Sequence, residues 1–172
     1  MEDILKLIDQ LIAEHKAISE RTLSLEKVAN DASLLADLDE AKTTFVPGRF
    51  NQSQSLKELQ EMLAGIDTWL DRHFNREETI LLKAVETDGD RKFITALNSL
   101  LLEHTDLRNR ITHAKQHVAE LTGGGLGKHQ WDASANDMRT HLAHTRRLLG
   151  DHAAMENELF GELRRHLKES AK

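Results

Sequence analysis

The chain has no cysteine and no tyrosine, and it has little proline and glycine. It contains 1 proline and 9 glycines, too few turn residues for an all-β fold of many short strands. The lack of cysteine excludes disulfides, a thiolate nucleophile, a cysteine-based zinc site, cysteine-ligated iron–sulfur clusters and c-type haem attachment. The lack of tyrosine excludes a tyrosyl radical and a tyrosinate ligand. The composition therefore favours a helical protein without sulfur chemistry.

The length and the charge balance limit the number of domains and the partners. A chain of 172 residues has the length of one domain, so we expect residues 1–172 to form a single unit. The net charge of −6 and the pI of about 5.9 give no basic surface for nucleic acid or anionic membranes. No apolar run approaches the ~18 residues of a membrane span, and the chain begins with acidic residues where a signal peptide is basic. We therefore expect a cytoplasmic protein with no nucleic-acid or membrane partner; the sequence does not indicate its oligomeric state.

Four stretches place apolar residues at alternating steps of three and four, the period of an amphipathic α-helix. They span about residues 2–30, 53–86, 90–121 and 132–168. Residues 31–52, between the first two stretches, predict a connecting segment with a short helix of unknown role. Four long amphipathic helices in one small chain predict an all-α fold, the antiparallel up-down-up-down four-helix bundle.

Histidine and glutamate interrupt these apolar stripes. The first and third stripes each contain one histidine, and the second and fourth each contain a histidine followed one turn later by a glutamate. The second stripe is expected to continue from the glutamate through Ile80 and Ala84. A single histidine in a core is more often a hydrogen-bonded residue than a ligand, but buried carboxylates are costly unless a cation or donors compensate for them. The six interrupting residues are His15, His73, Glu77, His104, His152 and Glu156.

The interruptions repeat along the chain and fall at similar heights. Glu14-His15 in the first stripe matches Glu103-His104 in the third, and His73-x3-Glu77 matches His152-x3-Glu156, so the chain looks like two related helical hairpins. At a rise of ~1.5 Å per residue and with alternating helix direction, all six lie about 14 to 24 Å above one end of the bundle. The sequence therefore predicts that they converge in one layer.

At these positions the sequence resembles the hemerythrin-like family of HHE cation-binding domains. The resemblance covers nearly the whole chain and rests on the order His, His-x3-Glu, His, His-x3-Glu. It implies an oxo- or hydroxo-bridged centre of two non-haem irons between the helices. Imidazoles with carboxylates also suit iron on general grounds, although zinc and manganese accept the same ligands. The resemblance implies that Glu77 and Glu156 bridge the irons, with His15 and His73 on one iron and His104 and His152 on the other.

One position departs from the oxygen-carrying members of that family, which have a second histidine one turn after the third-helix histidine. Here that position is Arg108, which implies open or water-filled positions on both irons. The resemblance then implies a protein that reacts with or senses oxygen, peroxide or nitric oxide in redox or nitrosative stress, or in iron-cluster repair. Members with the repair role carry a cysteine-bearing segment, and this chain has no cysteine.

Two other functions remain open. One is reversible oxygen binding or iron handling, and the other is a metal-free helical interaction module in which the polar residues set the helix register. The sequence does not indicate whether the protein is an enzyme.

Other histidines have metal-like spacing or share a core face. His113-x3-His117 is turned by about 180° and 220° from His104 on a helical wheel, so we interpret it as a solvent-facing pair rather than as ligands. His141 shares a face with His152 and is expected to cap the far end of the core, with an access route or a proton relay as the alternative. We expect His129, His144 and His166 on the surface.

Four further residues lie next to the six in sequence or in the stripes. Glu14 and Glu103 point elsewhere on the wheel, so we assign them no supporting role from the sequence. Trp69 and Phe74 are expected to pack among the helices.

Overall fold

A computed structural model describes residues 2–30, 54–88, 90–123 and 125–170. Every regular element within these residues is a helix, and none of them forms a strand. The prediction of an all-helical chain is confirmed for this part. The connecting segment that we predicted at residues 31–52 lies outside the described residues.

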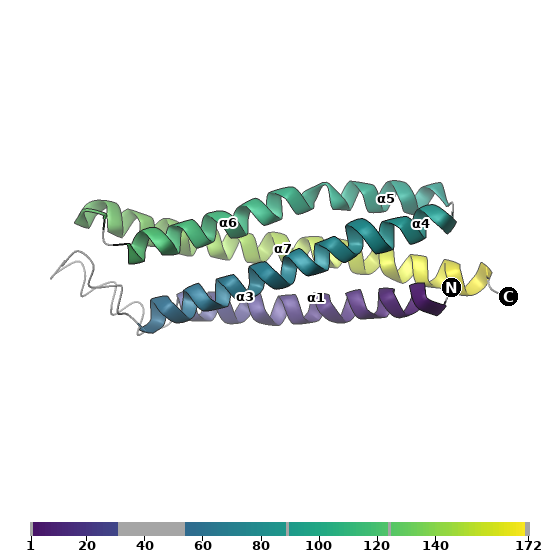
Figure 1. The fold of residues 1–172 in the computed structure, drawn as a ribbon, viewed down its shortest axis with the longest axis horizontal. Coiled ribbons are helices and arrows are strands. Elements are labelled where there is room, and N and C mark those ends of the chain that lie inside the picture. The colour runs from purple at the N-terminus through teal and green to yellow at the C-terminus, as the bar shows by residue number, and fades with distance from the viewer. Residues whose placement is uncertain (1, 31–53, 89, 124, 171–172) are drawn as a thin grey trace.

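The helices form four long runs that lie side by side along the longest axis of the molecule (Figure 1). The first run contacts the second and the fourth, and the third run also contacts the second and the fourth. Both ends of the chain lie at the same end of the molecule. The runs are α1 (Glu2–Ala29); α3 (Gln54–Arg76), the π-helix η2 (Glu77–Leu81) and α4 (Leu82–Asp88); α5 (Arg91–Leu101) and α6 (Glu103–Thr122); and α7 (Lys128–Ser170).

The fourth helix begins at Lys128, earlier than the predicted start near Asp132. The side chain of Gln130 accepts a hydrogen bond from the backbone of Gly127, and the amide of Trp131 bonds to the Gly127 carbonyl at 2.9 Å. The indole of Trp131 is buried and donates to the carbonyl of Leu121 near the end of α6. These bonds satisfy backbone groups at both helix ends, which explains the early start.

The apolar core consists of two clusters with a layer of polar residues between them. One cluster includes Ile18, Leu70 and Leu107, and the other includes Leu11 and Phe160. Along each helical run the polar residues come between members of the two clusters. We call the six residues His15, His73, Glu77, His104, His152 and Glu156 the polar layer.

The π-helix changes which residues of the second run are buried. We predicted a stripe through Ile80 and Ala84, but the structure buries Leu81 and Val85, and Ile80 is 54% exposed. A π-turn holds more residues than an α-turn, so the apolar face after Glu77 moves on by one residue. The prediction for Ile80 and Ala84 is therefore wrong.

This shift predicts unequal costs for two adjacent truncations. We expect Leu81→Ala to lower the free energy of unfolding by about 2 to 4 kcal/mol, because Leu81 is fully buried. Ile80→Ala should change it by less than about 0.5 kcal/mol. Urea denaturation of both variants measures the difference, and equal costs would contradict the shifted face.

The third run is also interrupted, at Leu102. This residue separates α5 from α6 and is 79% exposed, although it directly precedes Glu103 and His104. Both departures from regular α-helix therefore lie beside members of the polar layer. No helix among the described residues is both long and apolar enough to cross a membrane.

Candidate metal centre

The structure brings all six residues of the polar layer together in the middle of the helices. Each of them is at most 3% exposed. The i, i+4 spacing of His73 and Glu77, and of His152 and Glu156, puts each pair on one helix face. The ligand atoms form two groups in which all atoms lie within 4.8 Å of one another.

The first group joins the first two helical runs to α7. The Nε2 atom of His15 lies 3.1 Å from Oε2 of Glu156 and 3.6 Å from Oε1 of Glu77. The Nε2 atom of His73 lies 3.2 Å from the same Glu77 oxygen. The two rings are 4.8 Å apart between centroids. Two imidazole nitrogens and one oxygen from each carboxylate therefore surround one point.

The second group lies on the other side of the carboxylates. The Nε2 atom of His152 is 3.1 Å from Oε1 of Glu156, and Nε2 of His104 is 3.6 Å from that oxygen. His104 Nε2 also lies 3.5 Å from Oε2 of Glu77 and 3.1 Å from His152 Nε2. Each glutamate thus presents one oxygen to each pair of histidines.

The outward nitrogen of every layer histidine has a fixed partner. The Nδ1 atoms lie 2.8 to 2.9 Å from an oxygen on another helical run, in a ring that passes around the helices. An Nδ1–H that donates to such a partner leaves a lone pair on the inward Nε2, which is the tautomer that a metal needs. The pairs are His73 with Glu14, His104 with Glu78, His152 with Glu103 and His15 with Asn157.

Glu14 and Glu103, to which we assigned no role from the sequence, both contact histidines of the polar layer. They do not share a face with the histidines beside them, but each reaches a histidine of the neighbouring run. A helical wheel describes one helix and cannot show this contact. The signal was present in the repeat, because Glu-His occurs in both hairpins.

The repeat is incomplete at one position. Glu78 follows Glu77 and bonds to His104, whereas the matching residue after Glu156 is Asn157, which bonds to His15. Three of the four outer partners are therefore carboxylates and the fourth is a neutral amide.

Several inward-facing atoms of the layer lack hydrogen bonds. They are buried, and among the described residues neither Nε2 of His15 and His73 nor any carboxylate oxygen of Glu77 and Glu156 has a hydrogen-bond partner. Buried carboxylates without donors are strongly unfavourable unless a cation lies beside them. The donor set of imidazoles and carboxylates suits borderline divalent and trivalent transition metals. The residues present therefore fit a metal centre.

Without metal, protons on the histidines compensate for part of the negative charge of the buried carboxylates. Burial lowers the pKa of His15, but the carboxylates of Glu156 and Glu77 and the amide of Asn157 outweigh burial and raise the pKa to about 10. Burial also opposes protonation of His152, yet Glu156 and Glu103 raise its pKa. The pKa of Glu156 is held far below its usual value despite burial, because three histidines face it. At neutral pH the metal-free layer therefore keeps a charged histidine beside a carboxylate.

Arg108 lies outside the layer. Its guanidinium bonds to Glu78 at 2.7 Å and to Asp71 at 3.2 Å, and it lies over the ring of Phe74. The ring of Phe74 is buried and stacks on His104 with centroids 3.9 Å apart. Arg108 thus reaches His104 in two ways, through Glu78, which bonds to that histidine, and through Phe74, which stacks on it.

The structure places the other predicted residues at the edges. Trp69 packs against the core and stacks on the ring of His73. His129 and His144 are exposed, as expected, but His166 is half-buried and lies 3.3 Å from Asp88.

Two pockets reach the layer from outside. A pocket of about 540 Å³ between α1 and α7 includes His15 and Asn157, next to the small residues Ala153 and Ala154. A smaller pocket of about 240 Å³ between α6 and α7 includes His152. Each group of ligand atoms therefore has a histidine at the floor of a pocket.

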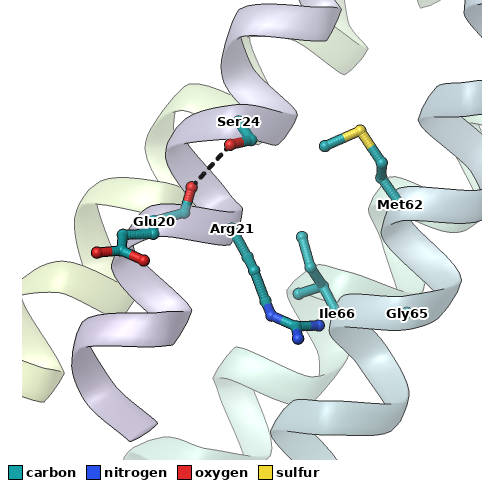
Figure 2. A pocket seen from close by; sticks show the side chains of 6 residues that line it. All are labelled: Glu20, Arg21, Ser24, Met62, Gly65 and Ile66. Carbon is teal, nitrogen blue, oxygen red and sulfur yellow. Dashed lines mark hydrogen bonds between the residues drawn. The ribbon is translucent and has the colours of Figure 1, made fainter. Parts of the chain in front are cut away.

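A further pocket of about 260 Å³ lies between α1 and α3 and contains no member of the polar layer. Figure 2 shows that the side chain of Arg21 extends across it towards Ile66, with Met62 on the α3 side. We do not assign a site there.

The comparison with protein families agrees with this geometry. The family model of the hemerythrin HHE cation-binding domain matches residues 6–164, which include the whole polar layer and its four outer partners. No curated protein and no solved structure matches the chain significantly. The chain belongs to the hemerythrin family of HHE cation-binding domains.

Proposed function

We propose that the polar layer holds two non-haem irons with an oxo or hydroxo bridge, and that the protein reacts with or senses oxygen, peroxide or nitric oxide. In this proposal residues 1–172 form one antiparallel up-down-up-down four-helix bundle. The family match supports cation binding. The observation that carries the proposal further is that Glu77 and Glu156 each direct one oxygen to each pair of histidines. Two carboxylates in this position are suited to bridge two cations.

The ligand set follows from the two groups of atoms. His15 and His73 would hold one iron and His104 and His152 the other, with Glu156 in both groups. Glu77 would be shared through its Oε2 atom, which lies 3.5 Å from Nε2 of His104. When bound, the pair of irons supplies one-electron redox chemistry and open coordination positions for a small ligand. Two negative charges on the shared carboxylates offset part of the metal charge.

The other residues of the chain orient the ligands and control access. The outer partners would fix the ring positions and accept the remaining N–H of each ring when its inward nitrogen holds a metal. The two apolar clusters limit the entry of water from both ends of the bundle. The pockets at His15 and His152 provide routes for molecules as small as oxygen or nitric oxide. Arg108 binds Glu78 and adds no third histidine to either iron, which favours reaction or sensing over reversible oxygen storage.

One observation favours a second candidate function. The raised pKa of His15 shows how a proton can compensate for the carboxylates, and such a layer would serve a metal-free interaction module by setting helix register. That function predicts full folding and no change on chelation.

Ligand reactivity tests the proposed function. We expect the optical spectrum of the iron-loaded protein to change on addition of peroxide, nitric oxide or, in the reduced form, oxygen. The Thr22→Ala variant, which alters a buried residue outside the layer, should respond in the same way. An iron-loaded protein with an unchanged spectrum under all three ligands would rule out reaction and sensing at this centre.

The outer partners give a more graded prediction. Glu14→Gln keeps an oxygen near Nδ1 of His73 but replaces the charged acceptor of that contact with a neutral amide. We expect this variant to bind metal about 10- to 100-fold more weakly, the range for outer partners of metal-bound histidines. Competition with a chelator measures the change. Glu20→Gln, at an exposed position of the same helix, is the control, and equal affinities in both variants would refute a supporting role for Glu14.

A further inference from the structure

A second group of histidines lies on α6 and α7, away from the polar layer. His113 and His117 stand one turn apart on α6, and the ring of His141 from α7 lies near both. The ring centroid of His141 is 6.2 Å from that of His113 and 5.7 Å from that of His117. We call these three residues the surface histidine cluster. From the sequence we did not expect this cluster, because we interpreted His141 as a cap of the core and the other two histidines as a solvent-facing pair.

The distances between the ring centroids are close to those of histidines that bind the same metal ion. Three imidazoles on a tetrahedral ion with metal–nitrogen distances of about 2.0 to 2.1 Å have ring centroids about 5 Å apart. The ring pairs inside the polar layer are 4.8 and 5.0 Å apart. The surface histidine cluster is therefore about 1 Å wider than these pairs. Side-chain rotation can close this gap, since His113 is exposed and His117 is only half-buried.

His141 already has the partner that a metal-bound histidine requires. Its Nε2 lies 2.8 Å from the backbone carbonyl of Arg110, and a carbonyl can only accept a hydrogen bond. The Nε2 therefore carries the proton, which leaves Nδ1 with a free lone pair in the neutral ring. Metal-binding histidines commonly donate their other N–H to a carbonyl or a carboxylate, as the residues of the polar layer do.

The two α6 histidines are free to serve as ligands. Within the part of the chain that the structure describes, neither ring has a hydrogen bond or an ion pair. His113 lies about 14 Å along α6 from His104, at ~1.5 Å per residue. The cluster is therefore separate from the polar layer.

We propose that the surface histidine cluster is a second metal site, which binds one divalent ion of the zinc or nickel class with water in the remaining position. Three neutral nitrogen ligands favour such borderline ions over magnesium or calcium, which prefer oxygen. Binding joins α6 to α7 near the end of the bundle opposite the chain termini. It does not depend on the proposed di-iron centre.

Titration of the iron-loaded protein with Zn²⁺ in a calorimeter tests this site. We expect one additional equivalent to bind, and we expect His141→Gln and His117→Gln each to weaken that step at least tenfold. His144→Gln, an exposed position on α7, should bind like the unaltered protein. The iron content should stay the same in all three variants, which separates this site from the polar layer.

Co²⁺ gives an independent readout, because tetrahedral coordination by imidazoles produces an intense visible spectrum. The expected result is such a spectrum in the iron-loaded protein and its loss in His141→Gln. Absence of an additional equivalent, or equal binding by His141→Gln and His144→Gln, would overturn the proposal. Neither outcome would bear on whether the polar layer holds iron.

Discussion

Replacing both layer carboxylates, Glu77→Ala with Glu156→Ala, should abolish iron binding. We expect the unaltered protein to retain two irons per chain after desalting, and the double variant to retain almost none. The reason is geometric, since each carboxylate supplies one oxygen to each pair of histidines. Loss of both therefore removes half of the protein ligands at both metal positions at once.

Single variants make this prediction sharper. Glu156→Ala should weaken both metal positions together, because His15 and His152 both face its oxygens at 3.1 Å. His73→Ala removes a ligand from one position only, so we expect it to leave one iron bound more firmly than the other. Thr22→Ala, at a buried position outside the layer, controls for general damage to the core. Circular dichroism verifies folding, and a folded double variant with two irons would contradict the assignment of the ligands.

The second large effect is a pH dependence that separates the metal-free protein from the loaded one. The pKa of His15 rises from an ordinary value of 6.5 to about 10 in the folded metal-free protein. A raised pKa means that the folded state holds the proton more tightly than the unfolded state. This contribution to stability is complete below pH 6.5 and is lost as the pH rises through about 10. The raised pKa of His152 acts in the same direction.

Metal should reverse this pH trend, because in the proposed centre a bound ion replaces the proton on His15. Metal binding must then release protons, and its affinity must increase as the pH rises over the same window. We therefore expect the metal-free protein to lose on the order of a few kcal/mol of stability between about pH 7 and pH 10. The gap in Tm between the loaded and the metal-free protein should widen over that range.

Thermal unfolding of both forms at several pH values measures this gap. His15→Gln should flatten the profile of the metal-free protein, whereas His144→Gln at an exposed position should keep it. A metal-free protein whose stability stays constant from pH 7 to pH 10 would show that His15 is not charged in the layer.

The sequence predicted the helical runs and the composition of the layer because both depend on periodicity. A residue that shares a stripe with apolar neighbours is buried whatever its type, so His15 and His104 could be placed from spacing alone. The buried positions after Glu77 could not be placed in this way, because the prediction assumed a constant α-helical period. The π-turn at Glu77–Leu81 breaks that period and buries Leu81 in place of Ile80.

Side-chain contacts between helices also could not be predicted from the sequence. The bonds from Glu14 to His73 and from Glu103 to His152 depend on the distance between two helices and on their relative rotation. The same limit applies to His141, since only the packing of α7 on α6 brings it close to His113 and His117. Spacing within one helix carries no information on either quantity.

The central claim is that two irons share the polar layer, and Mössbauer spectroscopy of the iron-57-loaded protein with a matched iron assay tests it most directly. The account predicts two irons per chain whose ferric spins are coupled to a diamagnetic ground state. A single uncoupled iron per chain, or a folded protein that binds none, would contradict it.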